Sequence, residues 1–274
     1  MAEQVSFKTR VKDTAIRVAP DYYSYYVCRD YLLMSDSFKS APYYIVRAQK
    51  DNYLHLVGVS TKLSATAFFD KCMNGTLDES DFEITAHGQD KKQSKGSIRR
   101  KIKSLPLITG LFTDSSLIEE NFKKNTVLCT FASSDGSCTL GFIATPSARP
   151  KTLLEGDELD HTKAKNLKIV LSKARDDTKF STVIVGTNDD LISVYDSIKD
   201  LISEDIDKRI VYATVSKQSR SEAFIAKSQE TLVEKPRVSI HDRLEAGKKR
   251  SQEQYTRPAQ NYDTRSLDKD ASYQ

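Results

Sequence analysis

The residue of this sequence whose type and setting best suit acid–base chemistry is His55. It interrupts an apolar run, residues 53–59, whose Val, Leu and Tyr content is typical of a β-strand. Strand alternation would place His55 on one face with Tyr53 and Val57, and Gly58 would permit a bulge. Because imidazole titrates near neutral pH, His55 suits a general acid or base in a cleft. The alternative is a hydrogen-bonded core histidine, and the sequence alone favours it because half-buried histidines are common.

A second candidate is the basic segment at residues 85–104, which has seven Lys and Arg side chains against one acid, Asp90. Clustered cations release counterions when they meet a nucleic-acid backbone, so the segment predicts a phosphate-binding surface. Its candidate nucleic-acid-binding residues are Lys91, Lys92, Lys95, Arg99, Arg100 and Lys103. The alternative is a solvated loop that runs into a helix, which is what a charge run usually is. Tyr43, Tyr44 and Tyr53 could stack bases beside it, although such tyrosines more often pack into a sheet.

The sequence lacks the motifs that are typical of several other classes of enzyme. The four cysteines contain no CxxC pair and the four histidines no HExxH spacing, so no metal site is predicted and reduced thiols are expected. The sequence has no GxGxxG, no GxxxxGK[ST] and no GxSxG, which disfavours nucleotide-driven chemistry and a serine hydrolase. We therefore expect neither a metal nor a cofactor. The net charge of +4 is too small to indicate a nucleic-acid partner by itself.

Membrane association is not expected. No window approaches the roughly 18 consecutive apolar residues of a spanning helix, and the first residues do not resemble a signal peptide. The sequence predicts a cytoplasmic protein.

The pattern of elements predicts an α+β fold with an antiparallel sheet built from hairpins and helices packed mainly on one face. A doubly wound sheet is disfavoured, because strands occur in pairs rather than alternating singly with helices. Helices are predicted over residues 20–35, 65–74, 115–124 and 189–202. Ser64 is the N-cap candidate of the second helix, and Gly75 ends it. Hairpins are predicted over 43–48 with 53–59, over 126–132 with 137–144, and over 167–174 with 180–187.

The composition changes near Ala226. Residues 227–274 have few aliphatic side chains and many Gln, Ser, Lys and Glu, so they cannot bury enough apolar surface to offset the entropy of ordering. The sequence therefore predicts a globular domain at 1–226 and a charged, largely disordered tail at 227–274. Within the tail, residues 239–253 could form a short helix on a host or mobile-element protein, although a solvated segment is the simpler interpretation.

Several segments together resemble a nuclease family. They are YYIVRAQKDNYLHLVGV, FFDKCMNGTL, KGSIRRKIKSLPLI, RPKTLLEGD and LKIVLSKARDDTKFSTVIVG. The chain resembles the phage Barnase-EndoU-colicin-RelE-like nuclease type four family over about residues 15–205. The HLxG core of that family is matched by His55-Leu56-Val57-Gly58, where a Thr is usual in place of Val57. A Pro-x-Ser-Leu motif is matched by Pro150-Lys151-Thr152-Leu153, in which Thr152 keeps the hydroxyl.

The resemblance implies a compact Barnase-EndoU-colicin-RelE-like ribonuclease fold and metal-independent cleavage of RNA, in proteins of phages, plasmids and conjugative elements. In such cleavage a base removes the ribose 2′-hydroxyl proton, the oxygen attacks phosphorus, and an acid protonates the leaving 5′-oxygen. The resemblance makes His55 the candidate acid or base, while Lys151 and Thr152 would contact the scissile phosphate. For Lys151 and Thr152 the alternative is a solvated loop after Pro150.

Two hypotheses therefore stand. The first is an endoribonuclease or toxin-like effector of a mobile element. The second is a non-catalytic protein that uses the basic segment and the tail to hold nucleic acid or a host protein. A concave basic cleft that joins His55 to Thr152 would favour the first, and a histidine enclosed by aliphatic side chains would favour the second.

Overall fold

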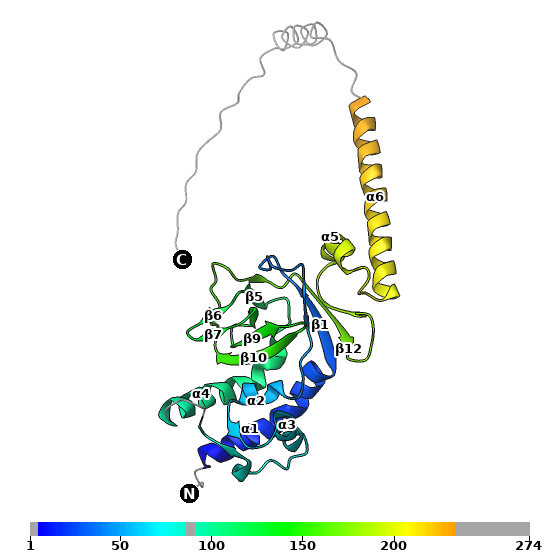
Figure 1. Cartoon of the computed structure of the whole chain (residues 1–274). Helices are drawn as coiled ribbons and strands as arrows, with labels where there is room; N and C mark the ends of the chain where they lie inside the picture. Colours follow the sequence, from blue (N-terminus) through cyan, green and yellow to red (C-terminus); the bar gives the residue numbers. More distant parts are fainter. Residues whose placement is uncertain (1–4, 86–90, 234–274) are drawn as a thin grey trace, which may run out of the picture. The chain divides into compact units, whose positions relative to one another are not determined.

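The computed structural model describes residues 5–85 and 91–233 (Figure 1), which form a mixed α+β structure around a sheet rich in antiparallel pairs. The described sheet has nine strands in the order β11-β5-β8-β9-β10-β2-β1-β12-β13, and β10 with β2 is its parallel pair. In chain order the elements are α1 (Phe7–Tyr22), η1 (Tyr23–Val27), β1 (Arg29–Met34), β2 (Tyr44–Val46), α2 (Asn52–Val57), β3 (Ser60–Thr61), α3 (Ala65–Met73), η2 (Glu79–Asp81), β4 (Phe82–Glu83), α4 (Lys91–Ser104), η3 (Leu105–Gly110), β5 (Leu117–Glu120), β6 (Lys123–Lys124), β7 (Val127–Leu128), β8 (Phe131–Ser134), β9 (Cys138–Ala144), β10 (Ala148–Glu155), β11 (Lys165–Asn166), β12 (Ile169–Ala174), β13 (Thr182–Val185), α5 (Asn188–Ile198) and α6 (Glu204–Val233).

The chain divides into two compact units, residues 1–216 and 217–274. The first holds the whole sheet, and the described part of the second, residues 217–233, is helical. Because α6 continues past residue 226 and residues 234–274 lie outside the described part, the predicted boundary at 226 stays a prediction. The helix predicted at 239–253 also lies outside the described residues.

Helices cover both faces of the sheet. Figure 1 shows α1 to α4 gathered on one side of it, where they share the larger core with inward side chains such as Leu33 and Val46. On the other face, α5 and the first turns of α6 pack on Leu32 and Leu171 of β1 and β12. The prediction of helices mainly on one face is therefore too narrow, because β1 and β12 bury apolar side chains on both sides. Within the described residues, no helix combines the length and apolarity needed to cross a membrane.

The helix predicted at residues 20–35 is confirmed as far as Val27 and wrong beyond it. Helix α1 begins earlier, where the Ser6 hydroxyl accepts a hydrogen bond from the Thr9 amide at 3.0 Å, and it ends two residues after Pro20. A π-helical turn follows, and Arg29–Met34 form the strand β1 between β2 and β12. A short apolar run is compatible with a buried strand as well as with a buried helix. Here the run forms a strand because β2 and β12 pair with its two edges.

The predicted hairpin of residues 43–48 with 53–59 is also wrong. Its second half is the helix α2, which buries Tyr53, Leu56 and Val57 and ends at Gly58, whose φ is +80°. The Tyr53 hydroxyl donates to the Ala15 carbonyl at 2.7 Å and ties α2 to α1. His55 is therefore a helical residue.

Residues 115–124 hold strands where a helix was predicted. Glu119 and Glu120 of β5 are buried, and hydrogen bonds from distant segments satisfy their carboxylates. Glu120 accepts from the Lys39 amide and the Tyr44 hydroxyl, both at 2.7 Å, and Glu119 accepts from the Asp160 amide at 2.7 Å. The two carboxylates are thus partners for loops on other parts of the chain.

Predictions that depend on local signals are confirmed. Ser64 caps α3 by accepting a hydrogen bond from the Ala67 amide at 3.1 Å. The hairpin of β8 with β9 turns at Asp135-Gly136, where Gly136 has φ +89°, and β12 pairs with β13. All four cysteines are free thiols.

Candidate functional site

Residues 91–104 of the basic segment form the helix α4, which exposes five of its cations. Ser94 and Ile98 are buried, while Lys92, Lys95, Arg99, Arg100 and Lys103 are exposed. Lys92, Lys95, Arg99 and Lys103 are three or four residues apart, so they share one face. Lys91 begins the helix. Lys103 forms an ion pair with Glu155, at the end of β10.

Two of the tyrosines considered for base stacking have packing roles instead. Tyr53 is fully buried, and the half-buried Tyr44 donates its hydroxyl hydrogen to Glu120.

His55 is exposed on α2, close to α4. The Lys101 ammonium donates a hydrogen bond to the His55 carbonyl at 2.5 Å, so the contact is with the backbone and the imidazole is left to solvent. A Cβ on Gly58 would lie only 2.6 Å from Lys101 Cδ, so the Lys101 side chain passes directly over this glycine. Burial lowers the pKa of Lys101 to about 8.

The pKa of Lys101 predicts a pH dependence of stability. An ordinary lysine pKa near 10.5 in the unfolded chain exceeds the folded value, so the unfolded chain binds more protons between pH 8 and 10.5. The free energy of unfolding should therefore rise across this range, by on the order of 2 kcal/mol relative to a Lys101→Met variant. Urea unfolding of both proteins at pH 7.5 and 9.5 measures this, and the same pH dependence in both would contradict it.

Lys151 and Thr152 lie in the strand β10 and not in a solvated loop. A register shift between Pro150 and Thr152 marks a β-bulge. The exposed Lys151 donates a hydrogen bond from Nζ to the Leu128 carbonyl at 2.8 Å. Thr152 is 8% exposed, and its methyl carbon would lie 2.9 Å from a Cβ on Gly141, which pairs with it. Among the described residues, no hydrogen bond joins His55 to either side chain.

Four charged residues, each in or directly after one of four neighbouring strands, form a row across the sheet, which we call the charged row: Lys173, Asp30, Arg47 and Arg149. Asp30 of β1 pairs with Lys173 of β12 in the sheet register. Arg47 follows β2, and its amide donates to the Ala148 carbonyl of β10 at 2.8 Å, which aligns Arg47 with Arg149. Alternation puts all four on the face opposite Val46 and Ala148, away from α1 to α4.

Asp30 is the centre of the charged row. Its side chain is fully buried, and Arg47 reaches its Oδ2 through Nε at 3.0 Å and Nη2 at 2.5 Å. Lys173 Nζ is 3.3 Å from the same oxygen, and Arg175 Nε is 3.4 Å from Oδ1. One carboxylate thus faces three cations, which leaves an excess of positive charge at this face.

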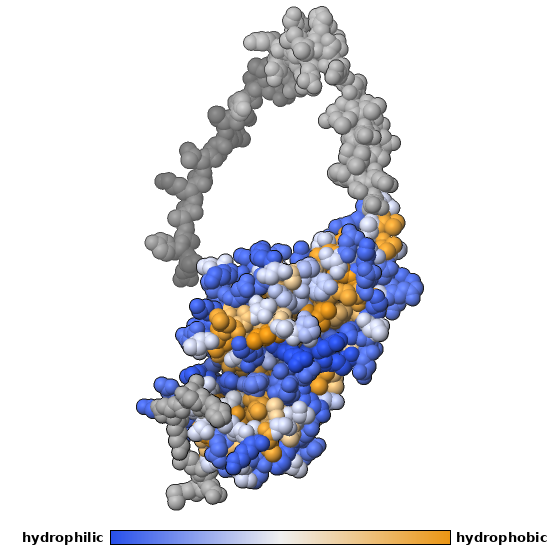
Figure 2. Space-filling model, in the orientation of Figure 1, coloured by the Kyte–Doolittle hydropathy of each residue, from blue (hydrophilic) through white to orange (hydrophobic). Residues whose placement is uncertain are grey.

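The outer part of the charged row has unused donors. The Arg47 side chain is 45% exposed although two of its nitrogens are held by Asp30. Arg149 Nε is buried and has no hydrogen-bond partner among the described residues, which is costly for a cationic donor unless an anion or water satisfies it. Figure 2 shows a strongly hydrophilic band over the region where Figure 1 draws β10 and β1.

The bulge of β10 adds Thr152 to this face. Leu153 points into the core shared with α1 to α4, so Thr152 points to the opposite side. In a regular strand, residues 149 and 152 would face opposite sides, and the extra residue at the bulge brings Arg149 and Thr152 to the same one.

Sequence reasoning predicted Thr152 as a site residue and missed the four members of the charged row. The available signal was a charged residue inside two predicted strands, Arg47 in 43–48 and Lys173 in 167–174. Asp30 lay in a predicted helix and Arg149 in no predicted element, and the register that aligns the four comes from long-range pairing. Among the described residues, no group of three or more His, Cys, Asp or Glu is arranged to hold a metal ion.

Comparison with known protein families shows to which family the chain belongs. The model of the phage-Barnase-EndoU-ColicinE5/D-RelE like nuclease 4 family matches residues 17–202. The chain belongs to this family. No curated protein and no solved structure matches significantly. Membership in this nuclease family supports a nuclease-like function with a nucleic acid as substrate, and the matched range contains His55, Thr152 and the whole charged row.

Proposed function

We propose that the chain is a metal-independent endoribonuclease that binds the scissile phosphate at the charged row. The observation that carries this proposal is the excess of cations around Asp30, next to a buried Arg149 donor that has no partner within residues 5–85 and 91–233. Guanidinium groups match phosphate geometry, and they stabilise the charge of a pentacoordinate phosphorane without a metal ion.

The chain's own residues would divide the reaction among them. The ribose 2′-oxygen attacks phosphorus while Arg47 and Arg149 stabilise the developing charge, and Asp30 positions Arg47 through two hydrogen bonds. Thr152 and Lys151 would contact the phosphate, and His55 would exchange protons with the 2′- and 5′-oxygens. His55 is included on the family resemblance: α2, which carries it, packs on the face of β10 opposite the charged row, so the RNA strand would have to pass around the strand ends to reach both.

The wider setting is proposed on the family relationship. A compact Barnase-EndoU-colicin-RelE-like ribonuclease fold, action as a toxin-like effector of a phage, plasmid or conjugative element, and RNA in the cytoplasm as the substrate all fit the nuclease family and its phage designation. A host or mobile-element protein bound through residues 227–274 is part of the same proposal.

The second candidate function is non-catalytic binding of nucleic acid or a host protein. One observation favours it: within the described part of the chain, no hydrogen bond orients the His55 imidazole, whereas a catalytic histidine is usually held by a partner.

RNA cleavage in EDTA tests the proposal. The purified full chain should produce discrete fragments from total RNA with 2′,3′-cyclic phosphate ends. Arg149→Gln should lower the cleavage rate about a hundredfold, because one oriented donor to a developing oxyanion contributes about 10²–10³ in rate.

The matched control is Arg29→Gln, which removes the same charge from β1. Arg29 is exposed and shares a face with Tyr31, on the side of the sheet opposite the charged row. It should therefore leave cleavage unchanged. Equal losses in both variants, or no cleavage by the parent protein, would contradict the proposal.

A further inference from the structure

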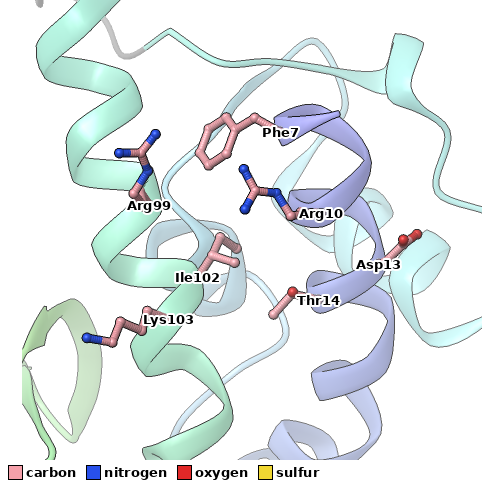
Figure 3. A pocket seen from close by; sticks show the side chains of 7 residues that line it. All are labelled: Phe7, Arg10, Asp13, Thr14, Arg99, Ile102 and Lys103. Atoms are coloured by element: carbon pink, nitrogen blue, oxygen red, sulfur yellow. The ribbon is translucent and has the colours of Figure 1, made fainter. Parts of the chain in front are cut away.

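A cavity lies between α1 and α4, apart from the charged row. Its volume is about 320 Å³, and it is lined by Phe7, Arg10, Asp13, Thr14, Arg99, Ile102 and Lys103. Figure 3 shows Phe7, Arg10 and Thr14 of α1 pointing toward α4, with the Arg10 guanidinium below the Phe7 ring. Sequence reasoning considered Arg99 and Lys103 but not Arg10, because α1 and α4 come together only in the folded chain.

Three cations surround the Phe7 ring. Lys95 Nζ lies 5.4 Å from the ring centroid, Arg10 Cζ 5.6 Å and Arg99 Cζ 5.7 Å. Each gains from the negative face of the ring, but the three repel one another. This arrangement therefore favours a bound anion.

The described part of the chain supplies little compensating charge. None of Arg10, Lys95 and Arg99 has an ion pair with another described residue. Asp13 lines the cavity, but Figure 3 shows its carboxylate pointing away from the gap, and its Oδ1 lies 3.9 Å from Lys12 Nζ. The N-terminal turn of α1, which begins at Phe7, adds the positive end of a helix dipole.

We propose that this cavity binds a phosphate group of an RNA strand, with Arg10 and Arg99 as its guanidinium ligands. The inference rests on the nucleic-acid substrate of the proposed function and adds a second phosphate contact, away from the scissile one. Two forked guanidinium groups from facing helices can each donate paired hydrogen bonds to phosphate oxygens, which exposed lysines alone do not provide. The Phe7 ring holds the cations together in the absence of the anion.

Equilibrium binding to a 2′-O-methyl RNA oligonucleotide tests the proposal, since such a probe cannot undergo attack by its own 2′-oxygen. Arg10→Gln in the full chain should weaken binding about tenfold and reduce the slope of log affinity against log salt by about one, because one phosphate contact is lost. The matched control is Arg17→Gln, because Arg17 is exposed on the same helix and outside the cavity lining.

Each outcome is informative. If Arg17→Gln weakens RNA binding less than Arg10→Gln does, the result supports a local contact between Arg10 and a phosphate. Equal weakening by both variants, or no weakening by Arg10→Gln, would overturn the proposal. Probes with a 5′-phosphate and with a 5′-hydroxyl identify which phosphate is bound. If the unsubstituted protein binds the 5′-phosphate probe more tightly and Arg10→Gln abolishes this difference, the cavity binds a terminal phosphate. If the unsubstituted protein binds both probes equally and Arg10→Gln weakens both, it binds an internal phosphate. Because the probe is not cleaved, failure of the nuclease proposal would not affect this result.

Discussion

His55→Ala should lower RNA cleavage by a hundredfold or more while the urea midpoint stays unchanged. General acids and bases typically contribute about 10²–10⁴ in rate, which sets the size of the effect. The fold should survive because the imidazole is exposed and fills no core space. The hydrogen bond from Lys101 goes to the His55 carbonyl, so it does not depend on the side chain that is removed. Cleavage rate and urea midpoint should be measured on one preparation.

The histidine control is His161→Ala. His161 is also exposed, and its Nε2 lies 2.9 Å from Asp157 Oδ2, apart from the proposed reaction centre. Full cleavage by His161→Ala and strong loss in His55→Ala would assign the acid–base role to His55. Full cleavage by His55→Ala per folded molecule would exclude it from the chemistry, and the acid or base would then have to lie on the face of the sheet that carries the charged row.

Asp30→Ala should destabilise the protein by about 3–5 kcal/mol, the cost of removing one partner from a buried ion pair. The buried Lys173 and the partly buried Arg175 would lose the carboxylate that they share, and Arg47 would lose two hydrogen bonds. The effect should be large because Asp30 links β1, β12 and the end of β2. Urea unfolding at pH 7 measures it.

The carboxylate control is Asp70→Ala. Asp70 forms one ion pair, with Lys50 at 2.9 Å, and both side chains are more than 40% exposed. Such a pair is screened by solvent, so its loss should cost at most about 1 kcal/mol. If Asp30→Ala were no more destabilising than this control, the charged row would not be held by Asp30, and the positioning of Arg47 would need another explanation.

Loss of Asp30 should also affect cleavage beyond its effect on stability. Arg47 should remain cationic in Asp30→Ala but lose the two hydrogen bonds that fix its direction. A rate that falls per folded molecule is therefore expected, and measurement well below the unfolding midpoint separates the two effects.

The sequence alone determined the features that depend on a few neighbouring residues. Ser64 caps α3 and Asp135-Gly136 turns a hairpin because each motif satisfies its own backbone locally. The exposed cations of α4 were predictable for the same reason, since their spacing on a helix follows from the sequence. The motifs around His55 and Thr152 were likewise sufficient to indicate the nuclease family that the family model matches.

Tertiary structure decided which apolar runs became helix and which became strand. Tyr53–Val59 and Leu117–Glu120 fit either state by periodicity, and the choice came from neighbours distant in sequence: α1 contacts Tyr53, and Asp160 and Tyr44 satisfy the two glutamates. Local propensity differs by well under a kcal/mol per residue for most side chains, so burial of this kind overrides it.

Tertiary structure also created the candidate site. Residues 30, 47, 149 and 173 meet only because β12, β1, β2 and β10 pair in one register, and one extra residue at the β10 bulge turns Thr152 to the same face. Arg10 reaches Arg99 only because α1 packs against α4. A sequence specifies the charge of each residue directly, but the distance between charges on different strands follows from pairing and packing of the whole chain, which no local pattern encodes.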